Sequence, residues 1–325
     1  MALPLVNDLR RAWPDVHITV AARDSVAPLF EMVPGVAGIL RFEGAGKTAI
    51  MRWREDAELL AQGQFDTALL LPNSFHAAWL AKQAGIPERW GYARDWRGRL
   101  LTRAIPRPPR DLHQAEYYQR LATGLGLSTS EGFARVEVGD AARARACALL
   151  SEAGLMPATR YVVFAPGAAY GRAKQWLPER FAELAQLLGR EGLSTVLIGT
   201  KADAGLCAGI VKAARNGATV VDLSGQTDLP TLAAVMAGAN ATIANDSGAM
   251  HLAGAVGCRV IAIFGPTDHR RTAPLRASAT KPAPVIVATR VWCRPCMLRE
   301  CPIDHRCMRR ITARDVFGSV TRGQE

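Results

Sequence analysis

The fold is indicated most directly by one stretch of the sequence, Ala241-Thr-Ile-Ala-Asn-Asp-Ser-Gly-Ala-Met-His251. Its first four residues are apolar or β-branched and predict a short buried strand. The polar residues that follow open a helix that extends to about Val256. A second strand is expected from Val260 to Phe264. Strand, loop, helix and strand in this order are typical of a doubly wound parallel sheet.

The same alternation extends through the rest of the chain. In the second half, strands are predicted over residues 161–165, 194–199 and 219–223, and helices over 178–190, 204–214 and 229–238. In the first half, strands are predicted over residues 16–22 and 66–71, and a helix over 76–84. Both halves are therefore expected to be α/β.

Two domains are expected, because 325 residues exceed what one hydrophobic core usually serves. We predict two Rossmann-like domains that face a cleft, residues 1–155 and 156–325. The chain opens in a helix with Leu3, Leu5 and Leu9 on roughly one face, whereas a Rossmann-like domain normally begins with a buried strand. The N-terminal domain is thus expected to lack its first strand.

The composition is that of an ordinary globular protein, with 49% hydrophobic and 21% charged residues. No apolar run approaches the ~18 residues of a membrane-spanning helix, and the N-terminus lacks the apolar region of a signal peptide. These features predict a cytoplasmic protein whose seven cysteines stay reduced. The net charge of +11 favours an anionic partner, such as nucleic acid, a phosphorylated glycolipid or an acidic membrane surface.

The first candidate site lies where the helix after residues 241–244 begins. In a parallel sheet, ligands bind beyond the carboxyl ends of the strands, where a helix N-terminus offers free N–H groups to a phosphate. Ser247 and Gly248 would supply that cradle. Asp246 would accept hydrogen bonds from sugar hydroxyls, and His251 would donate to phosphate. An ordinary capped helix with a buried histidine explains the same residues without any ligand.

A second candidate loop, residues 166–178, follows the strand predicted at 161–165. Small residues such as Gly167 allow the loop to wrap a ligand. Arg172 and Lys174 would present cations to phosphate oxygens. Both loops fall on one edge of the predicted sheet and together suggest a site for a diphosphate. A loop with a solvated lysine is the alternative.

A third element on the same edge is the turn Gly265-Pro-Thr-Asp268. It follows the strand that ends at Phe264. Gly265 and Thr267 would contact the phosphate or the sugar of the same ligand. A simple type I or type II turn explains these residues equally well.

The most concentrated positive charge lies at residues 89–110, a segment that ends in Pro-Arg-Pro-Pro-Arg. This composition predicts an irregular basic loop. Arg97, Arg99 and Arg103 would reach phosphates on a lipid acceptor or at a membrane surface. A solvated basic surface without a partner is the alternative.

Near the C-terminus, cysteines occupy positions 293, 296, 301 and 307. Thiolates of Cys293, Cys296, Cys301 and Cys307 could hold a tetrahedral zinc ion, although the second pair lacks the usual spacing of two to four residues. The alternative is a set of reduced thiols that pack the C-terminal segment against the N-terminal domain, with neighbouring arginines such as Arg294 facing solvent.

Together these motifs resemble one known family, the lipopolysaccharide heptosyltransferases of glycosyltransferase family 9. The residues from Asn245 to Thr267, the 166–178 loop and the cysteine-rich tail all carry the resemblance, which covers essentially the whole chain. The tail pattern Cys-x2-Cys-x4-Cys-Pro-x2-His-x-Cys-Met is most similar to the heptosyltransferase II branch.

The resemblance implies a GT-B fold and an inverting glycosyltransferase that needs no metal or other cofactor. It implies ADP-heptose as donor, held by the C-terminal domain. The acceptor would be the anionic lipid A–Kdo–heptose, bound by the N-terminal domain at the inner face of the inner membrane. By analogy Lys174 binds the donor phosphate. The diphosphate and heptose are then surrounded by Asp246, Ser247, Gly248 and His251.

The family also uses an N-terminal aspartate as general base, just ahead of the helix that matches residues 1–9. The chain has no residue at that position, and neither Asp8 nor Asp24 matches it. The catalytic residue is therefore unknown, and an inactive truncated homologue is one alternative.

Two further alternatives concern the class of protein. The first is another GT-B sugar-nucleotide enzyme, for example a different glycosyltransferase or an epimerase. The second, more remote, is a basic zinc-containing nucleic-acid-binding protein. The basic residues do not gather on one predicted helix with base-reading partners, so a nucleic acid is not the expected partner.

Overall fold

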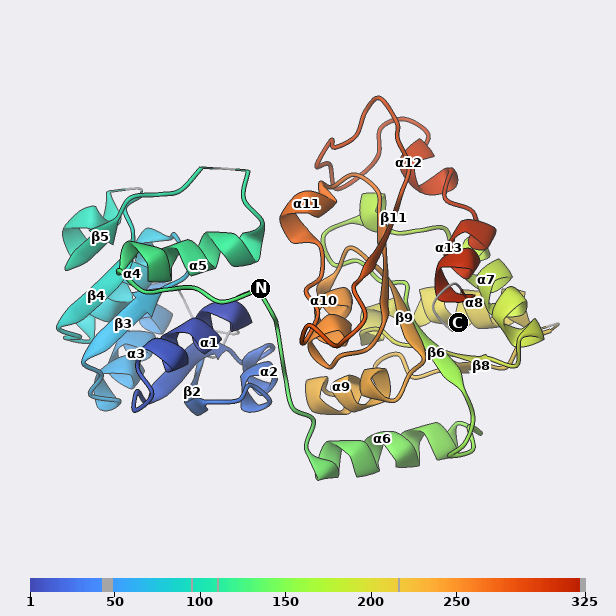
Figure 1. The fold of residues 1–325 in the computed structure, drawn as a ribbon, viewed down its shortest axis with the longest axis horizontal. Coiled ribbons are helices and arrows are strands. Elements are labelled where there is room, and N and C mark those ends of the chain that lie inside the picture. Colours follow the sequence, from blue (N-terminus) through green and yellow to red (C-terminus); the bar gives the residue numbers. More distant parts are fainter. Residues whose placement is uncertain (43–48, 95, 110, 216, 322–325) are drawn as a thin grey trace. The chain divides into compact units, whose positions relative to one another are not determined.

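The computed structural model describes residues 1–42, 49–94, 96–109, 111–215 and 217–321. The chain forms two compact units, Met1–Gly132 and Phe133–Glu325, here called unit 1 and unit 2 (Figure 1). Helix α6 (Asp140–Glu152) belongs to unit 2, where it packs on α9 (Leu229–Ala237). The boundary between the units therefore precedes α6 and does not fall at residue 155 as predicted.

Unit 2 is built on a parallel sheet with the strand order β11-β10-β9-β6-β7-β8. Its strands are β6 (Tyr161–Ala165), β7 (Ser194–Leu197), β8 (Val220–Asp222), β9 (Ala241–Asn245), β10 (Val260–Phe264) and β11 (Val285–Ala288). The chain adds β7 and β8 on one side of β6 and then returns to build the other side. The predicted doubly wound sheet is confirmed, and its strand order reverses between β6 and β9, which is where such sheets bind ligands.

The core of unit 2 lies on both faces of this sheet. Every residue of β6, β9 and β10 is buried, as expected for central strands covered by helices. The helices are α6, η2 (Arg172–Lys174), α7 (Pro178–Arg190), η3 (Lys201–Asp203), α8 (Ala204–Ala214), α9, α10 (Gly248–Ala255), α11 (His269–Thr272), α12 (Arg306–Arg309) and α13 (Ala313–Thr321). Phe181 of α7 packs with Phe164 and Trp176, with ring centroids 5.4 and 4.9 Å away. The loop that contains Trp176 is thereby attached to the core.

Unit 1 contains two parallel sheets, β1-β2 and β3-β4-β5. The strands are β1 (Ile18–Arg23), β2 (Val36–Phe42), β3 (Thr67–Leu70), β4 (Glu88–Tyr92) and β5 (Arg103–Ile105). The helices are α1 (Leu3–Ala12), α2 (Ala27–Glu31), α3 (Ala49–Gln62), α4 (Phe75–Gln83), η1 (Arg97–Leu100) and α5 (Gln114–Gly124). The absence of a first strand stays a prediction. None of the described helices combines the length and apolar character that crossing a bilayer requires.

The predicted basic loop is interrupted by regular structure, since its described part includes η1, β5 and most of β4. Arg97 is fully buried, at 0% exposure. Its Nε donates to the Tyr92 carbonyl at 2.9 Å, and its Nη1 donates to the Pro72 and Ser74 carbonyls. The predicted contact of Arg97 with an acceptor or membrane is therefore wrong, because the guanidinium holds backbone segments of unit 1 together. Arg99 and Arg103 are exposed.

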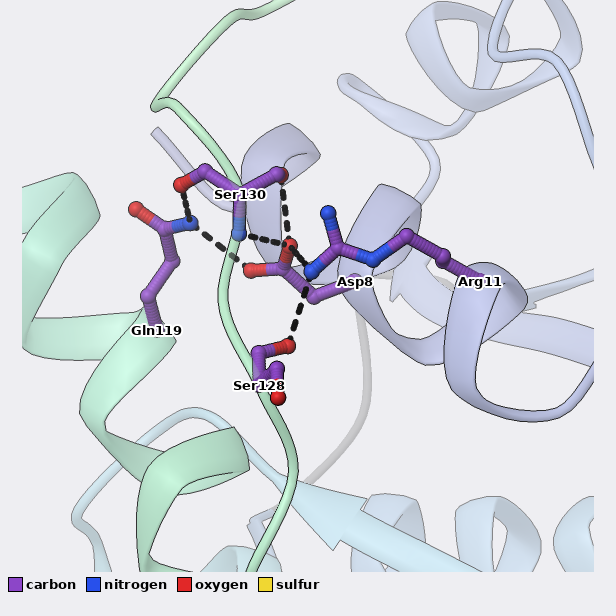
Figure 2. A network of polar contacts seen from close by, with 5 residues as sticks. All are labelled: Asp8, Arg11, Gln119, Ser128 and Ser130. Carbon is purple, nitrogen blue, oxygen red and sulfur yellow. Dashed lines mark hydrogen bonds and ion pairs between the residues drawn. The ribbon is translucent and has the colours of Figure 1, made fainter.

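Asp8 is the buried centre of a polar network that joins α1 to the end of unit 1 (Figure 2). Its carboxylate accepts hydrogen bonds from Ser130 N at 2.7 Å, Ser130 Oγ at 2.6 Å and Gln119 Nε2 at 2.7 Å. Arg11 Nη2 lies 3.4 Å from the carboxylate and donates to the Ser128 carbonyl at 2.9 Å. Asp8 is thus a structural residue, and its burial gives no reason to assign it as a general base.

We expect Asp8→Ala to lower the free energy of unfolding by about 3 kcal/mol, because the Ser130 and Gln119 donors would lose their buried acceptor. Urea denaturation followed by circular dichroism measures this loss. Asp15 is exposed and serves as the matched control; Asp15→Ala should change stability by less than about 0.5 kcal/mol. Equal effects of the two substitutions would contradict the structural role of the network.

Candidate active site

Asn245, the last residue of β9, joins the two loops at the switch point of the unit 2 sheet. Its Nδ2 donates to the Pro166 carbonyl at 2.7 Å, and its Oδ1 accepts from the Trp176 amide at 3.0 Å. The side chain is fully buried. The loop after β6 is therefore fastened at both ends to the residue that precedes Asp246.

This fastening brings together residues from the three predicted loops. Lys174 Nζ lies 2.6 Å from Asp246 Oδ2, and Thr267 Oγ1 donates to the same oxygen at 2.7 Å. The Lys174 and Asp246 side chains are only 14% and 6% exposed. Lys174 Nζ also lies 4.6 Å from the centre of the Tyr170 ring. The three side chains form a compact polar cluster at the carboxyl end of the sheet.

The start of α10 is not an ordinary capped helix. The Asp246 carboxylate is engaged by Lys174 and Thr267, and within the described residues the Ser247 side chain makes no capping hydrogen bond. A Cβ atom added to Gly248 would meet no described atom within 4 Å. There is thus open space beside Gly248 in the first turn of α10. The leading amides of a helix have no partner within the helix, which is why helix N-termini bind anions. His251 lies in the same turn and is half-buried.

The other predicted loop residues have different surroundings. Gly167 lies against Asp203, because an added Cβ would stand 2.6 Å from its Oδ1. Gly265 is buried against Met308, since a Cβ added there would stand 2.7 Å from the methionine methyl group. Both glycines thus permit close packing of loops. Arg172 is exposed, and its backbone amide faces Glu300 at 3.4 Å. Arg172 is therefore not part of the Lys174–Asp246–Thr267 cluster.

The C-terminal tail docks on unit 2 at the same edge of the sheet. The Cys296 and Met297 amides both donate to the Pro266 carbonyl at 3.0 Å, and the Ala173 amide donates to the Arg299 carbonyl at 2.9 Å. His305 Nε2 lies 2.8 Å from the Ala173 carbonyl. The tail thus packs on loops of its own unit.

The tail cysteines are all free thiols. No group of three or more His, Cys, Asp or Glu side chains that could hold a metal ion occurs in the described part of the chain. Burial, followed by the neighbouring Cys301, raises the pKa of the Cys307 thiol.

Sequence reasoning missed two residues of this edge. Asn245 was part of the quoted motif, but its role depends on a 79-residue separation from Pro166 that no local pattern reveals. Arg294 was expected to face solvent, yet it is partly buried and donates to the Thr267 carbonyl at 3.2 Å. The only sequence signal for Arg294 was its position between Cys293 and Cys296.

The two α/β units, with the cluster at the switch point of the unit 2 sheet, have the features of the GT-B fold of sugar-nucleotide enzymes. Residues 53–306 match glycosyltransferase family 9 (heptosyltransferase). The chain therefore belongs to glycosyltransferase family 9, as predicted.

The named relatives and the solved structure that the chain is similar to are heptosyltransferases. The chain is 30% identical to lipopolysaccharide heptosyltransferase 2 of Escherichia coli K12 over 86% of this chain and 82% of that protein. It is 29% identical to lipooligosaccharide heptosyltransferase 2 of Haemophilus ducreyi, covering 86% and 83% of the two chains. The structure of E. coli ADP-heptose lps heptosyltransferase II has a TM-score of 0.80 at 24% identity, covering 100% of this chain and 95% of that one. The similarity confirms the predicted fold.

We expect Lys174→Met to lower the free energy of unfolding by about 3 kcal/mol, because it leaves the Asp246 carboxylate buried without its cation. Adding Asp246→Asn should restore most of this loss, since the double variant has no unpaired charge. Urea denaturation of the single and double variants measures the coupling. Arg172→Met, a change of an exposed cation on the same turn, is the control and should cost less than about 0.5 kcal/mol. Strictly additive losses would contradict the coupling.

Proposed function

We propose that the protein transfers heptose from ADP-L-glycero-D-manno-heptose to the heptosyl-Kdo-lipid A acceptor during synthesis of the lipopolysaccharide inner core. Membership of family 9 and the names of the relatives support this substrate pair. The observation that carries the proposal is the Lys174–Asp246–Thr267 cluster beside the open first turn of α10. Lys174 supplies a cation and Thr267 a hydroxyl group near the start of α10, whose leading amides have no partner within the helix, and these groups suit the binding of a sugar diphosphate.

In this proposal the donor diphosphate binds at the N-terminus of α10. The amides at Ser247 and Gly248 and the helix dipole would stabilise its negative charge, with Lys174 and His251 as further donors. Asp246 would hold Lys174 in place and accept hydrogen bonds from heptose hydroxyls. When the acceptor hydroxyl displaces ADP from the anomeric carbon, the same groups would stabilise the leaving diphosphate without a metal ion. The group that removes the acceptor proton is not assigned.

The acceptor would bind to unit 1, at the cytoplasmic face of the inner membrane. The Arg99 and Arg103 side chains of unit 1 are exposed and remain candidates for contact with anionic lipid. Arg97 is excluded from this role by its burial. The membrane contact is thus proposed for a smaller basic surface than the sequence alone indicated.

ADP should bind the intact protein, and Lys174→Ala should weaken binding at least tenfold, about 1.4 kcal/mol, because a nearly buried cation is lost from the phosphate site. Isothermal titration calorimetry measures both affinities. Lys212→Ala, on the exposed side of α8, is the matched control and should bind ADP like the parent. Unchanged ADP affinity in Lys174→Ala would remove the lysine from the donor site.

The same titration tests the alternative donors. ADP-heptose should compete with ADP, whereas a UDP-sugar should not. Competition by UDP-sugars with equal affinity would favour another sugar-nucleotide enzyme of this fold.

Arg99→Glu/Arg103→Glu should reduce co-sedimentation with vesicles that contain anionic phospholipid, by several fold at low salt, because each basic residue near such a surface contributes about 1 kcal/mol. Arg190→Glu/Lys212→Glu, two exposed cations on α7 and α8 of unit 2, controls for the same change in net charge. If the two variants bind vesicles equally well, the unit 1 arginines form a solvated surface only.

A further inference from the structure

The C-terminal tail holds the residue that precedes Lys174 by both of its backbone groups. The Ala173 amide donates to the Arg299 carbonyl at 2.9 Å. The Ala173 carbonyl lies 2.8 Å from His305 Nε2. A carbonyl oxygen only accepts hydrogen bonds, so Nε2 carries the proton and donates, whether the imidazole is neutral or charged. Of these two bonds to Ala173, the one from His305 is made by a tail side chain.

The turn that carries Lys174 also packs closely on the tail. Tyr170 Oη donates to the Met297 carbonyl at 2.8 Å, and the centre of the Tyr170 ring lies 4.6 Å from Lys174 Nζ. Gly171 has a φ of 151°, and a Cβ atom added there would stand 2.4 Å from the Arg299 carbonyl oxygen. There is thus no room for a side chain between Gly171 and the tail. The tail therefore restricts the turn from which the lysine side chain extends.

The backbone conformation at His305 would suit glycine better than histidine. His305 has a φ of 55° and a ψ of 30°, which is the left-handed conformation. Residues with a Cβ atom rarely adopt this conformation, whereas glycine does so without a steric penalty. Glycine at this position would, however, lose the donor to the Ala173 carbonyl. The hydrogen bond from the imidazole offsets the disfavoured backbone.

We propose that His305 is a positioning residue that holds Lys174 in place for the donor diphosphate. The inference rests on the proposed function, because it takes Lys174 as a ligand of that diphosphate. Asn245 fixes the two ends of the loop to the sheet, and His305 fixes the residue next to the lysine. Without the imidazole, the Ala173 carbonyl would lose this hydrogen bond and the turn would sample more conformations. Ordering the lysine would then cost free energy when the ligand binds.

Two substitutions of similar length separate the hydrogen-bond donor from the shape of the side chain. His305→Gln places an amide N–H near the position of Nε2 and should keep ADP affinity within about twofold of the parent. His305→Met fills similar space without a donor and should weaken ADP binding about fivefold, because the lysine is still present but no longer held in position. Isothermal titration calorimetry measures the affinities. Parent-like ADP affinity in His305→Met, or equal weakening in both variants, would overturn the proposal.

A double variant tests whether His305 acts through Lys174. In a Lys174→Ala background, His305→Met should change ADP affinity by less than about twofold, since the side chain that it positions is gone. A general loosening of the tail would weaken binding by the same factor in both backgrounds, and that result would overturn the proposal. Ile303→Gln, an exposed residue of the same tail segment, is the control and should bind ADP like the parent.

Hydrogen–deuterium exchange of the ligand-free protein tests the positioning without ADP. Amides of residues 170–176 should exchange about fivefold faster in His305→Met than in the parent or in His305→Gln, whereas those of β6 should be unchanged. Unchanged exchange of residues 170–176 would overturn the proposal, as would equally faster exchange throughout unit 2. If the parent fails to bind ADP, the donor proposal fails, while exchange still decides whether His305 holds the turn that carries Lys174.

Discussion

The candidate site depends on one buried side chain, the amide of Asn245. The loop after β6 is rich in small residues, and its backbone groups could hydrogen-bond to water in many conformations. Its own sequence therefore does not select a single conformation. Asn245 satisfies a carbonyl at the start of that loop and an amide at its end. Asn245 is the last residue of β9, a fully buried strand, so these two hydrogen bonds fix the loop to the sheet. The position of Lys174 opposite Asp246 is a consequence.

In the Lys174–Asp246 ion pair, the carboxylate holds the lysine ammonium group at a fixed position. Removing the two charges of such a buried ion pair from water costs free energy that can exceed their mutual attraction. Here the Thr267 hydroxyl shares the carboxylate, and the Tyr170 ring faces the ammonium group. A diphosphate that approaches the first turn of α10 would meet a cation whose position is already set, so little ordering entropy would be lost on binding.

The C-terminal tail packs on the loops at the carboxyl edge of the unit 2 sheet. Its backbone binds the Pro266 carbonyl and the loop around Ala173, and its Arg294 binds the Thr267 carbonyl. The cysteines that dominate the tail sequence are free thiols in a docked segment. The tail contacts this edge through backbone amides and the Arg294 side chain, which a search for metal ligands overlooks.

The sequence by itself determined the α/β pattern, the doubly wound sheet and the three loops on one edge, because apolar periodicity and strand–loop–helix order are local properties. It also indicated Lys174, Asp246 and Thr267, whose residue types suit phosphate and sugar chemistry. Only the tertiary structure decided which arginine side chains are accessible to a ligand and which are buried. Arg97 lies in an arginine-rich segment yet is buried on carbonyls of unit 1, and Arg294 lies in a cysteine-rich segment yet lines a cavity. Burial depends on residues distant in the chain, so composition cannot separate a structural cation from a binding one.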